Sequence, residues 1–474
     1  MTDIYFDNHN HSCYSSALLG FPDAITRVNE LIQYAYDLGL SGIAITEHEG
    51  ISSHMQALKY YEKMEKDRPF KLALGNEIYL MSEAEDMSNR EGTDYTPYYH
   101  FILTALDTEG HKQLREISSK AWQRAYTSRR LMRRPTYYSD IEEIIGNNKG
   151  HLIASSACLG SYLDKLILQW KKPEPGYKEV QKSIGVLKRI SDFLSWCNKV
   201  FGSNNFYLEI QPCKEDNVDQ LIVNEAMKEL SVQYGFKIIA TTDTHYLNKE
   251  SALYHKTLLN SKDGDREVDS FYATTYLMSP QELREHLRIT FTDEEIDTIF
   301  KNSNEIADRV RTYDLKHMPM IPEIPLEKLP NFKITHRYKK YYDKYEYFKY
   351  YAYANNIQDQ YFFYRIEKGL EKFIESKPQK NLETYIDRIN KEAKELKGLS
   401  EIFNSHMAAY YTTVSRIVEI IWESNSFCMP SRGSAFGYLT CYLLEITQID
   451  PVPLGDYAPY WRHLSTERGI EIPD

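Results

Sequence analysis

The chain has 474 residues and a formal net charge of −11, with 42% hydrophobic and 26% charged residues. This length predicts two or three domains, and the composition places the chain among soluble globular proteins. The acidic charge is unlike the basic surface of most DNA-binding proteins, so nucleic-acid binding would require local positive patches or further parts of the molecule.

The N-terminus and the cysteines narrow the class further. The opening MTDIYFDNHNH has neither a basic nor an apolar signal region, and no run of eighteen apolar residues occurs in the chain. We therefore expect a cytoplasmic protein with no membrane partner. The six cysteines are scattered without CxxC spacing, which indicates reduced thiols and argues against a disulfide framework or a zinc ribbon.

The first part of the chain alternates between two periods. Seven short β-branched or aromatic runs, each followed by helical spacing, predict strands: DIYF, SGIAIT, FKLALG, HFILTAL, GHLIASS, FYLEI and FKIIATT. One helix is marked at both ends, because Pro22 and Asp23 open it and Gly39 stands at its C-cap. Such units predict a barrel-like α/β domain, since a buried parallel sheet needs helical crossovers.

Ionisable residues gather at the ends of these runs. The C-terminal ends carry His9, His11, Glu47, His48, Glu77, Cys158, Asp243 and His245, whereas His100 stands at the start of its run. The C-terminal ends of barrel strands form the active-site mouth, so these side chains should converge. Each alone is more often structural than a ligand. Together their nitrogen, oxygen and sulfur atoms predict a metal site suited to zinc, or to manganese or iron at oxygen-rich positions.

Seven motifs carry a family resemblance: NHNHSCYS, AITEHEG, LGNEIYL, YYHFILTALDTEG, IASSACLGSYL, FYLEIQ and ATTDTHYLN. In this order they resemble the polymerase and histidinol phosphatase (PHP) domain, above all the version at the N-terminus of the α subunit of bacterial DNA polymerase III. The resemblance covers roughly the first 260 residues. GNEIYL and TEHE look more like phage or prophage versions.

The resemblance implies a distorted (β/α)7 barrel that binds up to three metal ions. The implied ligand groups are His9, His11, Glu77 and Asp243; Glu77, His100 and Cys158, with Glu77 bridging; and His48 with His245. Polymerase relatives place an acid before the glycine of the first loop, where this chain has Leu19 before Gly20. Asp23 is the candidate to replace that acid.

Clustered metals suit phosphodiester hydrolysis, because they lower the pKa of bound water and hold the oxygens of an in-line displacement. One interpretation is therefore a 3′–5′ exonuclease or phosphatase, with Glu77 as a catalytic residue. The other interpretation is that the metals are structural, or that the barrel keeps its ligands while serving as a scaffold.

A change in composition follows the barrel. The stretch KHMPMIPEIPLEKLPNFKITH contains Pro319, Pro322, Pro325 and Pro330, and it predicts an extended connector between helical regions. The Tyr- and Lys-rich segment after it has side chains that can stack on bases and pair with phosphates. We favour the alternative, an amphipathic helix whose rings pack inward.

The C-terminal region resembles the beginning of the palm of the same α subunit, where a GRGS loop and an Ile-Asp-Pro turn precede alternating aspartates. In this chain the loop reads SRGS. Gly433 permits close backbone approach, Ser434 can donate hydrogen bonds, and Arg432 offers a bidentate fork to triphosphate oxygens. These three residues are predicted to bind the nucleotide. Ser431 and Tyr438 depart from the family pattern, which has Gly and Ser there.

Polymerase chemistry needs carboxylates that alternate along a strand and hold two Mg²⁺ ions. The chain supplies at most the first of them, Asp474, so the remaining acids are expected on another polypeptide. We expect a PHP barrel at 1–265, a helical connector with a Pro-rich linker at 266–335, and the start of an incomplete α+β palm at 336–474.

Two functions therefore compete. The first is the N-terminal portion of a replicative DNA-directed DNA polymerase, with primer-template DNA, dNTPs, the completing polypeptide and a sliding clamp as partners. The second is a stand-alone PHP-type metal-dependent phosphoesterase or exonuclease. The SRGS segment favours the first, because a phosphoesterase has no use for it.

Overall fold

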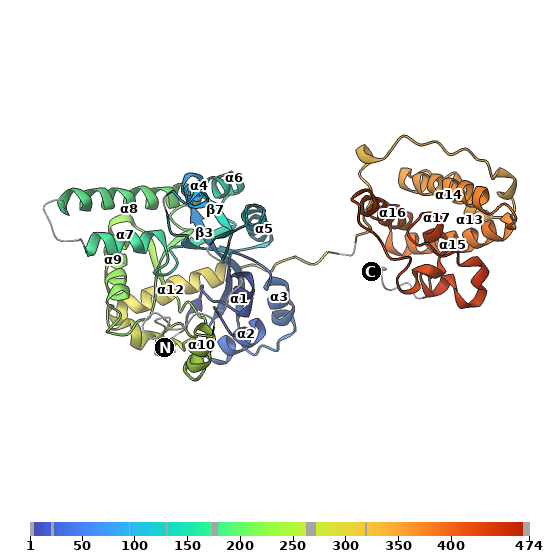
Figure 1. Cartoon of the computed structure of the whole chain (residues 1–474). Coiled ribbons are helices and arrows are strands. Elements are labelled where there is room, and N and C mark those ends of the chain that lie inside the picture. Colours follow the sequence, from blue (N-terminus) through green and yellow to red (C-terminus); the bar gives the residue numbers. More distant parts are fainter. Residues whose placement is uncertain are drawn as a thin grey trace. The chain divides into compact units, whose positions relative to one another are not determined.

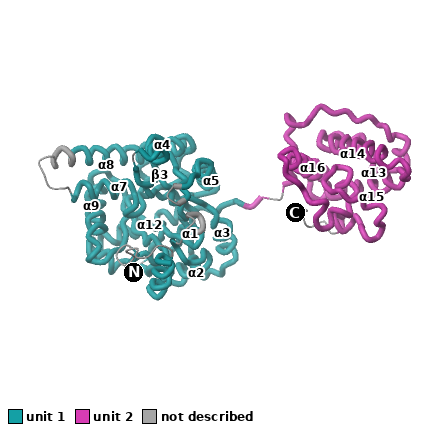
Figure 2. Tube along the Cα trace, viewed as in Figure 1, with its two compact units in different colours: residues 1–315 teal, residues 316–474 magenta. Residues whose placement is uncertain are grey.

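The computed structural model describes residues 4–19, 23–93, 95–128, 131–146, 148–172, 179–261, 272–317 and 320–467. The chain divides into two compact units, Met1–Leu315 and Lys316–Asp474 (Figure 2). Within the described residues, no helix combines the length and the apolar character that a membrane crossing requires.

The first unit is built on one mixed sheet. Its strands, in spatial order, are β1 (Phe6–Asp7), β2 (Gly42–His48), β3 (Lys71–Met81), β4 (Tyr99–Ala105), β8 (Leu152–Ser155), β9 (Phe206–Ile210) and β10 (Lys237–Ala240). These are the seven strands that the sequence predicts, and the α/β class is confirmed. Three short strands were not predicted. Strand β7 (Pro135–Tyr137) pairs in parallel with the end of β3, and β5 (Tyr126–Ser128) pairs with β6 (Leu131–Arg133).

One strand runs against the others. Strand β4 is antiparallel to both β3 and β8, whereas the remaining pairs along the sheet are parallel. Its register places His100 opposite Tyr79, near the C-terminal end of β3. The start of β4 therefore lies at the same end of the sheet as the C-terminal ends of its neighbours.

The two edges of the sheet meet at a short seam. Asn10 and Thr244 form a single parallel bridge just beyond β1 and β10. The His11 amide donates to the Thr244 carbonyl at 2.9 Å, and the Thr242 hydroxyl donates to the Asp7 carboxylate at 2.6 Å. The sheet is thus a nearly closed barrel whose seam joins the two ends of the sheet.

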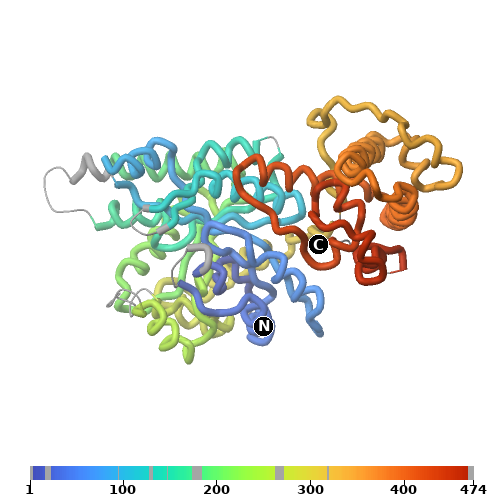
Figure 3. The backbone as a smooth tube through the Cα atoms, turned by 45° about the vertical axis from the view of Figure 1, so that its right-hand side comes forward, coloured from blue at the N-terminus to red at the C-terminus, as the bar shows by residue number. Residues whose placement is uncertain are grey.

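Helices surround this barrel (Figures 1 and 3). They are α1 (Cys13–Leu19), α2 (Val28–Asp37), α3 (His54–Lys63), α4 (Glu83–Glu91), α5 (Thr108–Gln123), α6 (Tyr138–Ile145), α7 (Tyr162–Lys171), α8 (Glu179–Phe201), α9 (Val218–Tyr234), α10 (Ala252–Leu259), α11 (Pro280–Leu287) and α12 (Asp293–Arg309). The apolar sides of most of these helices and the strands form one large buried core, as a sheet covered by helices requires.

Helix α2 begins later than the sequence predicts. Its N-cap is Arg27, and its first residue is Val28, rather than Pro22 or Asp23. The expected end is correct, because Gly39 follows the C-cap Leu38 with φ +88°, a conformation that favours glycine. Asp23 is buried instead of capping the helix, and it belongs to the site described below.

The first unit extends to Leu315, whereas the sequence analysis places the end of the barrel at residue 265. The difference comes from α11 and α12, which were expected in a separate connector. Ile296, Ile299 and Ile306 of α12 are buried in the barrel core, and the Asn302 side chain donates to the Ile238 carbonyl of β10 at 2.8 Å. Helix α12 therefore covers the barrel next to its seam.

The second unit is helical in its described part. It contains α13 (Glu346–Ala352), α14 (Ile357–Ser376), α15 (Leu382–Phe403), α16 (Met407–Glu423) and α17 (Leu439–Leu443). Residues 320–467 contain no strand, which corrects the expected α+β character for this range. The reason is a helical apolar period, shown by Phe362, Ile366, Leu370 and Phe373 on the buried side of α14.

The Tyr- and Lys-rich segment supplies much of this second core. Tyr338, Tyr342, Tyr345, Phe348 and Tyr351 are all buried in it. These five rings therefore pack inward, as the favoured interpretation predicts, and they are not available to stack on nucleic-acid bases, whereas Tyr350 and Tyr353 of the same segment are exposed.

Candidate metal centre

Eight predicted ligands meet at one end of the barrel. They are His9, His11, His48, Glu77, His100, Cys158, Asp243 and His245, and each is buried except His100. The side chain of His100 is 23% exposed. The reversed direction of β4 explains its place, because the start of that strand lies at the mouth.

Glu77 lies at the centre of the cluster. Its Oε1 is 2.7 Å from His100 Nδ1, and its Oε2 is 2.6 Å from His48 Nδ1 and 3.2 Å from His11 Nε2. The two carboxylate oxygens thus face different histidines, which is the arrangement that a bridging carboxylate needs.

Asp243 and Cys158 lie on two sides of this centre. Asp243 Oδ1 is 3.2 Å from both His9 Nε2 and His11 Nε2. The Cys158 Sγ is 3.4 Å from His100 Nδ1 and 4.0 Å from Glu77 Oε1. The neighbours of each residue agree with the ligand groups that the family resemblance implies, and these assignments remain a prediction.

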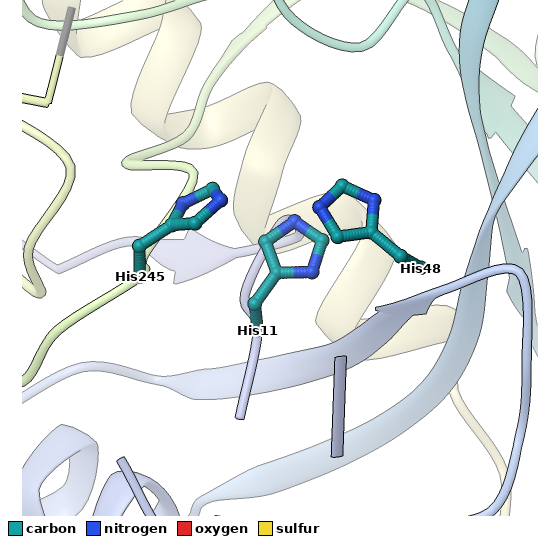
Figure 4. A group of neighbouring side chains, drawn as sticks. All are labelled: His11, His48 and His245. Carbon is teal, nitrogen blue, oxygen red and sulfur yellow. The ribbon is translucent and has the colours of Figure 1, made fainter. Parts of the chain in front are cut away.

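Asp23 joins a third group. Its Oδ2 is 3.1 Å from His48 Nε2 and 3.3 Å from His245 Nε2. Figure 4 shows the imidazole rings of His11, His48 and His245 gathered in one place, with His11 and His48 stacked at 4.2 Å between centroids. The buried carboxylate of Asp23 thus lies beside the two histidines of the third predicted group, and its role as a ligand in place of the missing acid remains a prediction. The side chain of Leu19 and residue Gly20 lie outside the described residues.

The donor atoms fit a cluster of divalent cations. Among the described residues, Glu77 Oε2, Asp243 Oδ1, Asp23 Oδ2 and His48 Nδ1 are buried and make no hydrogen bond of suitable geometry, although each lies within 3.2 Å of a nitrogen or oxygen of another residue of the cluster. Buried polar atoms are seldom left without a hydrogen bond, yet here they lie close to other atoms that can bind a metal. Three sets of three residues have ligand atoms within 4.8 Å of one another: His9, His11 and Glu77; His48, Glu77 and His100; and His11, His48 and His245. Imidazole, carboxylate and thiolate groups are the usual ligands of zinc and related metals.

Electrostatics supports the same conclusion. Burial opposes charge on Asp23, yet His245 and His48 hold the pKa of its carboxyl well below the ordinary value. Burial raises the pKa of the Cys158 thiol, and the negative charges of Asp243 and Glu77 raise it further. A cation would therefore compensate several buried carboxylates at once and would favour the thiolate that binds metals.

A second layer of carboxylates orients the histidines. Glu209 Oε1 is 2.6 Å from His9 Nδ1, and Glu209 also accepts hydrogen bonds from Thr241 and Ser155, each at 2.5 Å. This arrangement aims His9 Nε2 at the cluster, as the outer partners of metal-bound histidines commonly do. Sequence reasoning missed Glu209, although an acid inside the apolar strand FYLEI was a signal for it.

Glu47 has a similar role, although the sequence analysis grouped it with the potential ligands. It accepts hydrogen bonds from the Ser12 amide at 3.0 Å and from the Ser15 hydroxyl at 2.5 Å. The Ser15 hydroxyl is in turn 3.0 Å from His11 Nδ1. Glu47 therefore fixes Ser12 and Ser15, and through Ser15 it orients the ring of His11.

The predicted nucleotide loop lies in the second unit. Arg432 and Gly433 are exposed, and Gly433 has φ +55° with nothing within 4 Å of the position a Cβ would take. The Ser434 hydroxyl is 3.3 Å from His463 Nδ1. The base of the loop is fixed by the Gln448 amide, which donates to the Pro430 carbonyl at 2.8 Å. Asp474 lies outside the described residues.

Two families match the chain. Residues 7–213 match the family described as "PHP domain", and residues 360–474 match "Bacterial DNA polymerase III alpha NTPase domain". The chain contains a PHP domain and is homologous to DNA polymerase III α subunits. The sequence-based identification is thereby confirmed.

Named relatives include phage and bacterial polymerases. The chain is 36% identical to the "Probable DNA polymerase YorL" of Bacillus subtilis (strain 168) and to the "DNA-directed DNA polymerase" of Bacillus phage SPbeta, over 95% of this chain and 35% of each relative. It is 27% identical to the DNA polymerase III subunit alpha of Helicobacter pylori (strain ATCC 700392 / 26695), over 98% of this chain and 34% of that one. The chain thus spans about a third of the length of these relatives.

Among solved structures, an amidohydrolase from Chromobacterium violaceum aligns with a TM-score of 0.27 at 12% identity. It covers 51% of this chain and 88% of that chain, a likeness too weak to support an inference.

The ligand cluster of the PHP barrel opens into a cavity of about 490 Å³. Asp23, His48, His100, Cys158, Asp243 and His245 line it, together with Tyr79, Leu159, Gly160, Lys165, Leu168, Asp219 and Tyr272. Its volume is within the range of small-molecule and cofactor sites in proteins. The cavity therefore gives access to five of the eight predicted ligands, whereas His9, His11 and Glu77 do not line it.

Proposed function

We propose that the chain is the N-terminal portion of a replicative DNA-directed DNA polymerase of the DNA polymerase III α type. The observation that carries this proposal is homology over nearly the whole chain to proteins named as DNA polymerases. Those relatives are about three times longer, so the remaining polymerase domains belong to a further polypeptide segment. Primer-template DNA, dNTPs and, through that segment, a sliding clamp are the partners.

In this proposal the PHP barrel holds two or three divalent metals, with zinc at the histidine- and thiolate-rich positions and manganese or iron where oxygen ligands dominate. Bound metals supply an activated water and neutralise charge on a phosphodiester. His9, His11, Glu77 and Asp243 hold one ion, His100 and Cys158 share a second with Glu77, and His48 with His245 binds a third. The resulting activity is 3′–5′ exonucleolytic.

The second unit contributes the nucleotide loop of the palm. Arg432, Gly433 and Ser434 contact the triphosphate of the incoming nucleotide, and Asp474 is the first of the carboxylates that bind Mg²⁺. The exposed guanidinium and the left-handed Gly433 leave this loop open to an anion.

A stand-alone metal-dependent phosphoesterase is the second candidate. It is favoured by one observation, namely that all the predicted ligands of the barrel lie within the first unit. This alternative gives no role to the loop at Arg432.

A pair of assays on the purified chain distinguishes the two functions. We expect no primer extension from the chain alone and extension after addition of the polypeptide that carries the remaining domains. We also expect metal-dependent removal of nucleotides from a 3′-labelled primer. Hydrolysis together with failure of extension in the completed assembly would support the phosphoesterase instead.

A further inference from the structure

Lys165 is distinct among the residues that line the cavity of the PHP barrel. It is the one lysine or arginine among the described residues of that lining. Its side chain is exposed, and its ammonium group has no hydrogen bond or ion pair with any residue that the structure describes. None of the predicted metal groups includes it.

The position of Lys165 is fixed by the loop of Cys158, which precedes its helix, and by the contacts of that loop with His100. Helix α7 starts directly after the loop of Cys158, and the Ser161 hydroxyl caps it by accepting from the Asp164 amide at 3.0 Å. Ser161 also forms a bridge with His100, whose amide donates to the Gly160 carbonyl at 3.2 Å. Lys165 stands one turn further along the same helix, and its amide donates to the Ser161 carbonyl.

The carboxylates of the lining already have partners. Asp23 lies between His48 and His245, Asp243 contacts His9 and His11, and Asp219 pairs with Lys172. Asp164, next to Lys165 in sequence, is buried. The cation of Lys165 is thus left facing the cavity and the solvent, where an anion would meet it.

We propose that Lys165 binds a second phosphate of a polynucleotide substrate, next to the phosphodiester held at the metal cluster. The inference deepens the exonuclease activity proposed for the barrel and rests on it. A lysine suits this task, because its ammonium is a point charge on a flexible stem that can follow a mobile backbone. The predicted metal ions neutralise the phosphate that is hydrolysed. The additional positive charge of Lys165 would therefore favour a nucleic-acid strand, which carries a second phosphate, over a small phosphate ester.

The test compares substrates with one and several phosphates on the full chain loaded with zinc or manganese. Bis(p-nitrophenyl) phosphate is the single diester, and a thymidine tetranucleotide is the polynucleotide. We expect Lys165→Ala to lower kcat/KM for the tetranucleotide on the order of tenfold, the effect of one lost charged contact. Hydrolysis of the single diester should stay at the wild-type level, and Lys165→Arg should restore most of the loss.

Lys171→Ala is the matched control. Lys171 lies on the same helix and carries the same charge, but it pairs with Glu229 and does not line the cavity. This variant should behave as wild type towards both substrates. A similar loss in Lys171→Ala would mean that Lys165 acts only through the general charge of the helix, and the proposal would be wrong.

A binding measurement separates this inference from the proposed activity. Fluorescence anisotropy with a labelled phosphorothioate tetranucleotide needs no hydrolysis. Lys165→Ala should weaken binding and reduce the salt dependence by about 0.7 in the logarithmic slope, the value for one phosphate on a single strand. Unchanged binding, or equal losses for both substrates in the activity assay, would overturn the role of Lys165. If the wild type hydrolyses neither substrate, the hydrolytic activity proposed for the barrel is wrong, while the binding measurement still decides whether Lys165 contacts a phosphate.

Discussion

A single carboxylate connects most of the predicted metal ligands. Glu77 is within 3.5 Å of atoms of His9, His11, His48 and His100, and it lies in the middle of β3, where both neighbouring strands fix its backbone. Its position therefore depends on the sheet and not on a mobile loop. A change at Glu77 should affect more than one ion.

The first prediction concerns Glu77→Gln. The amide keeps the size of the side chain but removes the charge that two ions would share, so metal affinity should fall by about 10- to 100-fold or more. Elemental analysis after dialysis should show fewer bound metals than in the wild type, with loss of any nuclease activity. Glu229→Gln, an exposed change on α9, is the control. Full metal content and activity in Glu77→Gln would contradict the bridging role.

A second prediction concerns Arg432→Ala in the completed polymerase. Loss of a charged hydrogen bond to the triphosphate should reduce kcat/KM for dNTP by about 1.5 to 3 kcal/mol. Arg416→Ala is the control in the same unit, because Arg416 pairs with Glu423 and Glu419 on its own helix. Equal effects of the two changes in steady-state primer extension would show that Arg432 has no specific role.

The site histidines illustrate what the sequence can and cannot predict. The positions after apolar runs correctly identified His9, His48 and Asp243 as neighbours, because parallel strands end at the same side of a sheet. His100 did not obey this rule, and strand direction is not encoded in a short apolar run. Glu209 was missed, because a buried acid within a strand reveals its partners only after the chain has folded.

At the level of elements, long and regular patterns were the predictable ones. The seven main strands followed from their apolar runs, whereas β5, β6 and β7 have three residues each and no recognisable period. The start of α2 was wrong because Asp23 resembles a cap, yet its carboxylate binds two distant histidines. A tertiary contact outweighed a local signal at that position.

A buried histidine pair on α3 and α5 gives a third prediction. His54 Nδ1 is 3.1 Å from His111 Nε2, and His54 Nε2 is 2.9 Å from the Gly75 carbonyl. Burial lowers the pKa of His54 to about 3 and that of His111 to about 4, from an ordinary value of 6.5. The unfolded chain thus takes up these protons first as the pH falls.

The contribution of this pair to the free energy of unfolding should therefore decrease as the pH is lowered from 6.5 towards 4, by about 1.4 kcal/mol per pH unit for each proton. His111→Gln should make this decrease shallower by about one proton, as measured by urea unfolding at several pH values. His317→Gln, at an exposed position, is the control. Equal slopes in all three proteins would contradict the assignment, because other histidines are common to them.

The whole molecule consists of two units with separate cores, and they should respond differently to metals. Every predicted metal ligand is in the first unit. A ligand that binds only the folded state stabilises it by about 2.7 kcal/mol at a hundredfold excess over Kd.

The fourth prediction is that zinc or manganese added to chelator-treated protein raises the melting temperature of the first unit but not that of the second. Calorimetry should resolve one transition that shifts with metal and one that does not. The Cys158→Ser variant should show a smaller shift, since the thiolate is a stronger zinc ligand than a hydroxyl. No shift in either transition, together with no bound metal by elemental analysis, would refute metal binding.

The barrel seam has a consequence for the order in which the protein folds. Thr242 and Asp7 are 235 positions apart, and the predicted ligands before and after them come together only when the seam forms. Closing so long a loop is slow, because its entropy must be lost before any contact is gained. A ribosome must therefore finish most of the first unit before the ligand groups that include Asp243 or His245 can be complete, whereas the sets His9, His11 and Glu77 and His48, Glu77 and His100 lie within the first 100 residues. Until then, His9 and His11 lack their acidic partner Asp243, and ion binding at the positions that use Asp243 or His245 should mark the last step of barrel assembly.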